Sequence, residues 1–254
     1  KAVSDLSARL TAYNQERQQR CDELYAQAKA KLALRGAYGR VIMLWDESWN
    51  SGFVGIVAAR LAEEYGRPVI LFVNNGGTLK GSARSIEGVN IFEALRACSE
   101  FISEFGGHSQ AAGVNVSEEN FALLEEAMNN YMEEKYTAED FIPTIYISGG
   151  FGGENAIRLS HELEMFEPYG VGNKRPLFCA EVTACKPRPI KPLSSHLTFK
   201  CGALEMMYFG GAKYTEVLSS PAPKKLVFEY NVSRFRGREY IRGFVRDVIY
   251  DSDC

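Results

Sequence analysis

The chain has 254 residues, enough for one large domain or two ordinary ones. Hydrophobic residues make up 46% of it and charged residues 24%, which is typical of a soluble globular protein. No apolar run approaches the ~20 residues that a membrane-spanning helix needs, so the composition excludes a membrane protein. The net charge of −3 does not by itself favour a nucleic-acid-binding protein.

The first residues and the cysteines bear on the origin of the chain. It starts with KAVSDLSARL, which has neither an initiating Met nor an apolar signal core, and we expect a piece of a longer protein. The six cysteines are scattered, without a CxxC pair. This spacing disfavours a structural zinc site and a disulfide framework, and we expect reduced thiols in the cytoplasm.

The first 140 residues alternate helix-like and strand-like segments. Apolar residues at helical spacing predict helices at 4–34, 51–66, 90–107 and 117–136. Short apolar runs predict strands at 39–45, 67–73, 78–86 and 111–116. In the third helix, Asn90 is expected to be the N-cap, and the pair Gly106–Gly107 is expected to end the helix. This order predicts an α/β domain behind a long first helix.

The pattern changes after residue 140. A strand at 143–148 and a helix at 154–166 are expected before a Pro/Gly-rich connector, EPYGVGNKRP. Further strands are predicted at 177–186, 195–201, 203–209, 224–232 and 239–250, with a short helix at 212–220. Three strands, a helix and two strands form the layout of an OB-like β-barrel.

The charge supports a division into parts with different tasks. Residues 1–140 carry 14 basic and 20 acidic side chains, and the remaining residues carry 15 and 12. We therefore predict a connecting helix at 1–35, an α/β substrate-binding domain at 36–140 and an OB-like single-strand-binding domain at 141–254.

Two glycine-containing stretches of the α/β domain suit an anion. In EFGGHSQAAG (104–113), glycines would let backbone N–H groups converge on an anion beside His108. In GSARS (81–85), two hydroxyls and a guanidinium would suit phosphate oxygens. Both stretches also have plainer explanations, namely a helix end with a surface histidine and an edge strand with a solvent-facing arginine.

The segment SRFRGREYIRGFVR (233–246) alternates arginines with aromatic residues. Arginines that follow phosphates and rings that stack on bases hold single strands without reading their sequence. The residues expected to bind a single strand are Arg234, Phe235, Arg236 and Arg238. Because Tyr240 and Phe244 share one strand face, they are candidates for the barrel core instead.

Several separate segments are similar to the RecJ family of single-strand-specific 5′ exonucleases. The segment GSARSIEGVNIFEALRACSEFISEFGGHSQAAG closely resembles the family's DHH-associated domain, and WNSGFVGIVAARLAEEYGRPVILF resembles the segment upstream of it. NQERQQR is similar to the connecting helix, FEPYGVGNKRPLF to the passage into the OB domain, and FRGREYIRGFVRDV to its final strand. The resemblance spans nearly the whole chain and implies a mixed sheet with flanking helices, followed by an OB-like β-barrel.

The resemblance also implies roles for individual residues. Gly106, Gly107 and His108 would lie against the substrate backbone near the scissile phosphate. The terminal phosphate and first nucleotide would be contacted by Ser82, Arg84 and Ser85. Arg17 matches an arginine of the connecting helix that faces the same cleft. The chain departs from the family at Asn50, where the family usually has histidine, and an amide cannot become cationic.

The family hydrolyses phosphodiesters with Mn²⁺ or Mg²⁺ held by a separate DHH domain, which this sequence lacks. The resemblance therefore implies no catalytic residue and no metal site in this chain, which would bind without cutting. The implied partners are single-stranded DNA, the chain's own N-terminal DHH domain and other repair proteins such as single-strand-binding protein, in the bacterial cytoplasm. Two alternatives stay open: a DHH-family phosphodiesterase of short RNA or cyclic dinucleotides, and a non-enzymatic single-strand-binding adaptor.

Overall fold

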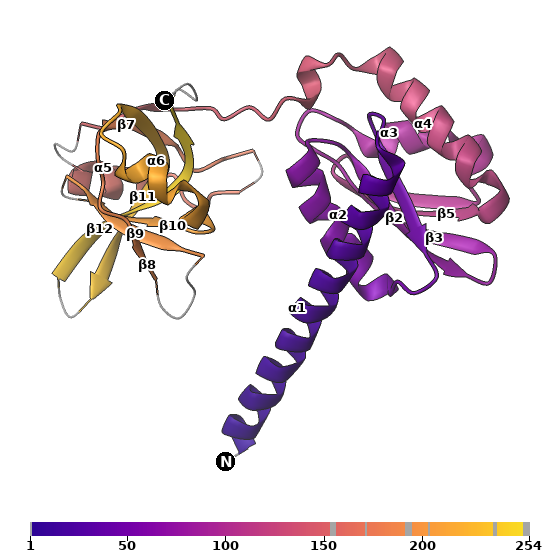
Figure 1. Cartoon of the computed structure of the whole chain (residues 1–254), viewed down its shortest axis with the longest axis horizontal. Helices are drawn as coiled ribbons and strands as arrows, with labels where there is room; N and C mark the ends of the chain where they lie inside the picture. The colour runs from indigo at the N-terminus through magenta and orange to yellow at the C-terminus, as the bar shows by residue number, and fades with distance from the viewer. Residues whose placement is uncertain are drawn as a thin grey trace. The chain divides into compact units, whose positions relative to one another are not determined.

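The computed structural model describes residues 2–152, 156–170, 172–190, 195–202, 204–235 and 238–250. The contacts divide the chain into two compact units, Lys1–Thr144 and Ile145–Cys254, each with its own core (Figure 1). The finer domain bounds expected from the sequence remain a prediction.

Unit 1 combines four α-helices with a mixed five-stranded sheet. Its helices are α1 (Ala2–Arg35), α2 (Ser51–Tyr65), α3 (Ile91–Ala97) and α4 (Phe121–Lys135). Its strands are β1 (Ile42–Asp46), β2 (Val69–Asn75), β3 (Thr78–Arg84), β4 (Glu104–His108) and β5 (Ala111–Ser117), in the order β1-β2-β3-β5-β4. Only β1 and β2 run parallel, because α2 connects them, and the other pairs are antiparallel. The predicted α/β domain behind a long helix is confirmed.

Local signals explain the helices that were predicted well. The amide of Asn50 accepts a hydrogen bond from the N–H of Gly52 at the start of α2, and Gly66 ends the helix in the left-handed conformation with φ 59°. In the second half of α1, Leu24, Ala28 and Leu32 recur on one face and are buried in a core shared with α2, β1 and β2. The first half of α1 projects beyond the sheet in Figure 1.

The predicted helix at 90–107 is wrong in its second half. Asn90 does cap α3, where its side chain accepts from the N–H groups of Phe92 and Glu93, but the helix ends at Ala97. The chain then forms β4 (Glu104–His108), which pairs with β5 through a two-residue hairpin loop. Gly106–Gly107 therefore lies inside a strand, because hairpin pairing with β5 replaces the local helical hydrogen bonds.

The two faces of this sheet are covered differently. One face carries Ile70, Phe72 and Val114 and packs against α3 and α4 in the larger core of unit 1. The other face carries Val69 and Leu71, which pack against α1 and α2. Among the described residues, this second core takes no buried side chain from β3, β5 or β4. On the face that α1 and α2 cover at β2, the part of the sheet formed by β3, β5 and β4 is therefore left open.

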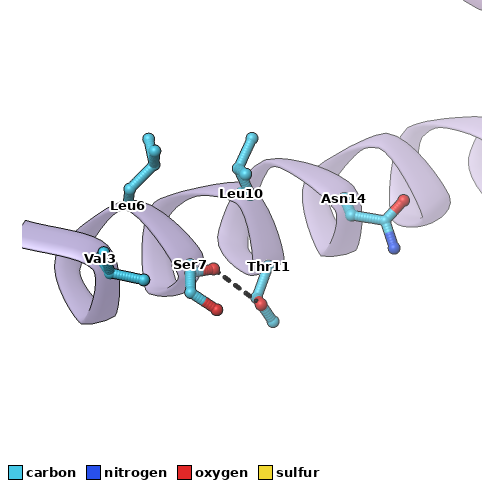
Figure 2. A pocket seen from close by; sticks show the side chains of 6 residues that line it. All are labelled: Val3, Leu6, Ser7, Leu10, Thr11 and Asn14. Atoms are coloured by element: carbon cyan, nitrogen blue, oxygen red, sulfur yellow. Dashed lines mark hydrogen bonds between the residues drawn. The ribbon is translucent and has the colours of Figure 1, made fainter.

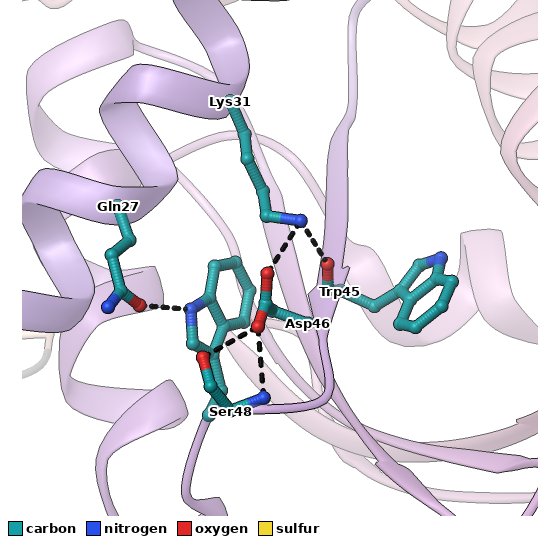
Figure 3. Close-up of polar contacts among 6 residues, drawn as sticks. Gln27, Lys31, Trp45, Asp46 and Ser48 are labelled. Atoms are coloured by element: carbon teal, nitrogen blue, oxygen red, sulfur yellow. Dashed lines mark hydrogen bonds and ion pairs between the residues drawn. The ribbon is translucent and has the colours of Figure 1, made fainter.

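Side chains of α1 and α4 satisfy the outer edge of β1. Lys31 donates to the carbonyl of Trp45 at 3.1 Å and pairs with Asp46 at 2.7 Å, as Figure 3 shows. Arg35 donates to the carbonyl of Met43 at 3.1 Å, and the amide of Asn129 accepts from the N–H of Val41 at 3.0 Å. These bonds attach α1 to the sheet and protect an edge strand from pairing with another chain.

Unit 2 is built on a seven-stranded sheet with the order β6-β7-β11-β12-β10-β9-β8. Its strands are β6 (Gly149–Gly150), β7 (Phe178–Val182), β8 (Arg188–Pro189), β9 (Leu197–Cys201), β10 (Leu204–Tyr208), β11 (Lys224–Phe235) and β12 (Arg238–Ile249). Its helices are α5 (Ala156–Glu164) and α6 (Thr215–Ser219). The parallel pairing of β10 with β12, and α6 between β10 and β11, fit the predicted OB layout.

Two details of unit 2 differ from the prediction. The sheet has the end strands β6 and β8, so the described strands do not form a closed barrel. The strand predicted at 143–148 is wrong, because pairing with β7 begins only where the N–H of Ser148 donates to the carbonyl of Leu177 at 2.7 Å. Before that point Tyr146 is exposed, and none of the described strands pairs with the backbone.

Candidate nucleic-acid interface

The open face of the sheet in unit 1 brings the two glycine-containing stretches together. Ser82 on β3 pairs with Gly113 on β5, which pairs with Gly106 on β4. In the next row, Arg84 pairs with Ala111, which pairs with His108. Directly opposed residues of antiparallel strands share a sheet face. We name this surface the glycine shelf, and it consists of Ser82, Arg84, Ala111, Gly113, Gly106 and His108.

The floor of the glycine shelf is bare backbone. A Cβ atom added to Gly106 or Gly113 would meet no heavy atom within 4 Å. A sugar–phosphate backbone or a flat ring could therefore approach the main chain closely at these two positions.

Arg84 is held at the border of the glycine shelf by its neighbours. Its Nη1 donates to Ser82 Oγ at 3.1 Å and to the carbonyl of Ala83 at 2.7 Å. Helix α2 lies directly against the pair, since a Cβ on Gly55 would come within 2.8 Å of Ser82 Oγ and 2.9 Å of Arg84 Nη2. The guanidinium is thus held in place, and its Nε and Nη2 make no hydrogen bond among the described residues.

Ser85 and Gly107 have structural tasks in this region. Ser85 Oγ donates to the carbonyl of Val89 at 2.7 Å, and its N–H donates to the carbonyl of Gln110 at 3.0 Å, which holds the hairpin loop. Gly107 has φ 149°, and a Cβ there would lie 2.3 Å from the carbonyl oxygen of Ala111. Their contact with a substrate stays a prediction.

His108, Arg17 and Asn50 differ in their surroundings. His108 is exposed at the end of β4, and its ring has no hydrogen-bond partner among the described residues. Arg17 lies on the projecting half of α1 and donates to Asn14 Oδ1 at 3.0 and 3.3 Å. Asn50 caps α2, a task that an amide performs well. The role of Arg17 at the substrate also stays a prediction.

The arginine-rich hairpin predicted to hold a single strand is described only in part. Arg234 pairs with Glu239 and Phe235 with Arg238 at the ends of β11 and β12. The side chains of these three candidates, and the whole of Arg236, lie outside the described residues.

Sequence reasoning missed an aromatic cluster in unit 2, on the face of its sheet that points away from the core. Phe209 is 56% exposed, stacks on Phe244 with ring centres 6.3 Å apart, and meets the ring of His196 edge-on at 5.2 Å. Tyr240 and Phe244 were candidates for the core, but Gly243 and Val245 are buried instead, and Tyr240 is 42% exposed. Gly243 pairs with buried Tyr230 on β11 and buried Met206 on β10, so its neighbour Phe244 lies on the opposite face of the sheet.

Acidic partners balance the arginines of this outer face. Arg242 pairs with Glu205 at 3.3 Å, and Arg246 pairs with Glu229 at 2.6 Å. Exposed pairs of this kind contribute at most about 1 kcal/mol each, so a phosphate can compete for the arginines. The surface therefore offers stacking rings together with exchangeable cations.

The described residues show neither a metal centre nor a membrane span. No group of three or more His, Cys, Asp or Glu side chains among them is arranged to hold a metal ion. No described helix combines the length and the apolar composition needed to cross a membrane.

Comparison with known proteins agrees with both units. Residues 36–134 match the DHHA1 domain family, and residues 154–247 match the RecJ OB domain family. The single-stranded-DNA-specific exonuclease RecJ of Bacillus subtilis is 28% identical over 97% of this chain, which covers 32% of that protein. RecJ of Escherichia coli is 38% identical over 37% of this chain and 17% of its own length.

A solved structure shows the same fold. RecJ from Thermus thermophilus, crystallised with Mn²⁺, matches 96% of this chain and 36% of its own, with a TM-score of 0.73 and 24% identity. A second structure of that protein, with Mg²⁺, matches equally well. The chain thus spans about a third of the length of the first proteins that it resembles.

Proposed function

Because this chain belongs to the RecJ family and carries its DHHA1 and OB domains in order, we propose that it is the substrate-binding part of a 5′–3′ exonuclease specific for single-stranded DNA. Its parent protein would act in DNA repair and recombination. The observation that carries the proposal is the glycine shelf, which aligns Arg84 and Ser82 with Gly106 and His108 across three strands.

The glycine shelf has the chemistry of a site for a terminal nucleotide. Arg84 supplies fixed guanidinium donors, and Ser82 supplies a hydroxyl beside them. His108 lies across the floor in the same row as Arg84 and can donate a hydrogen bond to a phosphate in either neutral tautomer or when charged. The bare floor lets the strand's backbone lie close to the sheet.

Unit 2 would bind the nucleotides that follow the terminal one. The rings of Phe209 and Phe244 offer stacking surfaces for bases, and the arginine-rich hairpin with Arg234, Phe235, Arg236 and Arg238 adds positive charge. The match of residues 154–247 to the RecJ OB domain family favours this function over a phosphodiesterase of short RNA or cyclic dinucleotides.

The hydrolytic step is assigned to residues outside this chain. The divalent ions Mn²⁺ and Mg²⁺ of the Thermus structures do not fit the described residues, which form no ligand cluster. We expect the 254-residue chain to bind single strands without cutting them, and its parent to be a metal-dependent exonuclease.

The projecting half of α1 would contact the parent's catalytic DHH domain. Figure 2 shows Val3, Leu6 and Leu10 on this half, and all three are more than half exposed. Uncovered apolar side chains at helical spacing are typical of a helix face that packs against another domain.

The test is a titration of fluorescent single strands with and without a 5′-phosphate. We expect salt-sensitive binding that Arg84→Ala and His108→Ala weaken by about 10-fold, in keeping with lost charge-assisted bonds. The weakening should be larger for the phosphorylated strand. Lys135→Ala, on α4 at the other face of the sheet, is the matched control.

Three results would contradict the proposal. Equal binding by the wild type and both shelf variants would show that the glycine shelf does not hold phosphate. Absence of binding to any strand would remove the substrate-binding role from this chain. Hydrolysis of the strand in Mn²⁺ would contradict its assignment to the absent domain.

A further inference from the structure

We propose that Lys80 is a second phosphate contact and that the strand leaves the glycine shelf along β3. This inference rests on the proposed function and adds a residue that gives the bound strand a direction. Its starting point is a third row of the same open face, in which Lys80 pairs with Asn115 and Asn115 pairs with Glu104.

Lys80 lies on the open face of the sheet. Along β3, buried Leu79, Gly81 and Ala83 alternate with Lys80, Ser82 and Arg84, which are exposed or partly exposed. Alternation on a strand puts the last three side chains on one face. Because Ser82 and Arg84 border the glycine shelf, Lys80 must project from the same side.

The ammonium of Lys80 is available. Among the described residues it has no ion-pair or hydrogen-bond partner, whereas Lys29, Lys31 and Lys224 all have partners. An ammonium on a long, flexible stem suits phosphate as a point charge. The column on β3 therefore reads cation, hydroxyl, cation from Arg84 to Lys80.

In the row of Lys80, strand β4 carries a negative charge instead of a positive one. Glu104 accepts a hydrogen bond from Asn115 Nδ2 at 3.0 Å, which keeps a carboxylate on the far side of this row. A polyanion is repelled there and attracted to Lys80 two strands away. The charges thus direct the strand along β3 and leave the floor of Gly113 and Gly106 to its sugars and bases.

Spacing predicts the strand length at which Lys80 begins to matter. Four residues along an antiparallel strand span about 14 Å at ~3.4 Å each, so Lys80 and Arg84 are that far apart. Stacked nucleotides advance by about 3.4 Å along the helix axis, the shortest spacing a strand adopts, so Lys80 lies at most about four phosphates from the one on Arg84. A mononucleotide cannot reach both residues.

The experiment measures how affinity depends on length. Oligothymidylates of one to eight nucleotides with a 5′-phosphate compete with a labelled strand for the full 254-residue chain. For the wild type, affinity should rise between one and about five nucleotides. In Lys80→Ala we expect unchanged binding of the mononucleotide, about 3- to 10-fold weaker binding of the pentanucleotide and a salt slope lower by about one.

Further variants separate this inference from the proposed function. Lys80→Arg should restore the length dependence, and Lys135→Ala should match the wild type at every length. Lys80→Ala binding all lengths like the wild type, or weakening the mononucleotide equally, would overturn the inference. Arg84→Ala binding the mononucleotide like the wild type would instead overturn the proposed phosphate site itself.

Discussion

Gly55→Ala should separate the stability of unit 1 from its phosphate binding. The added methyl group would lie 2.8 Å from Ser82 Oγ and 2.9 Å from Arg84 Nη2, which is closer than van der Waals contact allows. Both atoms are at the ends of side chains, so they can move while the backbone stays in place. The variant should therefore fold and displace Arg84 from the border of the glycine shelf.

The expected free-energy changes have different sizes. Replacing glycine by alanine inside a helix favours folding by up to about 1 kcal/mol. Loss of the 3.1 Å bond between Arg84 and Ser82 costs about 0.5–1.5 kcal/mol, so the two effects on unfolding nearly cancel. A guanidinium that no longer meets its phosphate loses about 1.5–3 kcal/mol of binding, which is roughly a 10- to 100-fold weaker Kd.

The assay pairs thermal unfolding with titration of a 5′-phosphorylated oligonucleotide. Ala59→Gly, at an exposed position of the same helix, is the matched control. It should destabilise the chain by about 1 kcal/mol and leave binding unchanged. Wild-type affinity in Gly55→Ala would refute the idea that α2 positions Arg84. A loss of both stability and affinity in both variants would show that the two properties cannot be changed independently.

Two further outcomes follow from the structure. Burial alone would raise the pKa of Asp46, but the hydrogen bonds and charge of Lys31 and the hydrogen bonds of Ser48 lower the pKa to about 2, so this stabilisation is present above pH ~4 and is lost as pH falls toward 2. Asp46→Asn should therefore lower the free energy of unfolding, measured by urea denaturation, by about 1–2 kcal/mol at pH 7 and by much less at pH 2.5. An equal loss at both pH values would contradict the ion pair. Phe209→Ala should weaken single-strand binding by about 1–3 kcal/mol without a change in melting temperature, because Phe209 stacks on Phe244 in the aromatic cluster of unit 2. Phe166→Ala, at another exposed ring, should leave single-strand binding unchanged. Equal effects of the two substitutions on binding would argue against base stacking at the aromatic cluster.

Helices with their own end signals were predictable from sequence, and segments decided by distant pairing were not. Helix α2 carries both its cap Asn50 and its terminator Gly66, so its bounds follow from local chemistry. The stretch before Gly107 satisfies a helical pattern as well as a strand pattern. Its pairing with β5, which a linear pattern does not show, decides for the strand.

The candidate site divides in the same way. The residue types at Ser82, Arg84 and His108 suggested phosphate binding, because their chemistry is visible in the sequence. Their alignment across β3, β5 and β4 depends on strand register, and so does the contact of Gly55 with Arg84. In unit 2, the register of β12 pairs Gly243 with buried Tyr230 and Phe244 with Glu229, which places Phe244 outside the core.

The glycines of the two stretches fall into two groups, and only one of them is explained by the fold. A Cβ on Gly81 would lie 2.5 Å from the ring of Phe72, and one on Gly107 would strike the backbone of β5, so packing requires both glycines. Gly106 and Gly113 face open space, and their backbone does not have a positive φ. Nothing among the described residues requires glycine at these two positions, although glycine weakens a strand. A bound ligand that must approach the backbone closely would supply the missing reason, and the neighbouring Arg84 and His108 would suit an anionic ligand.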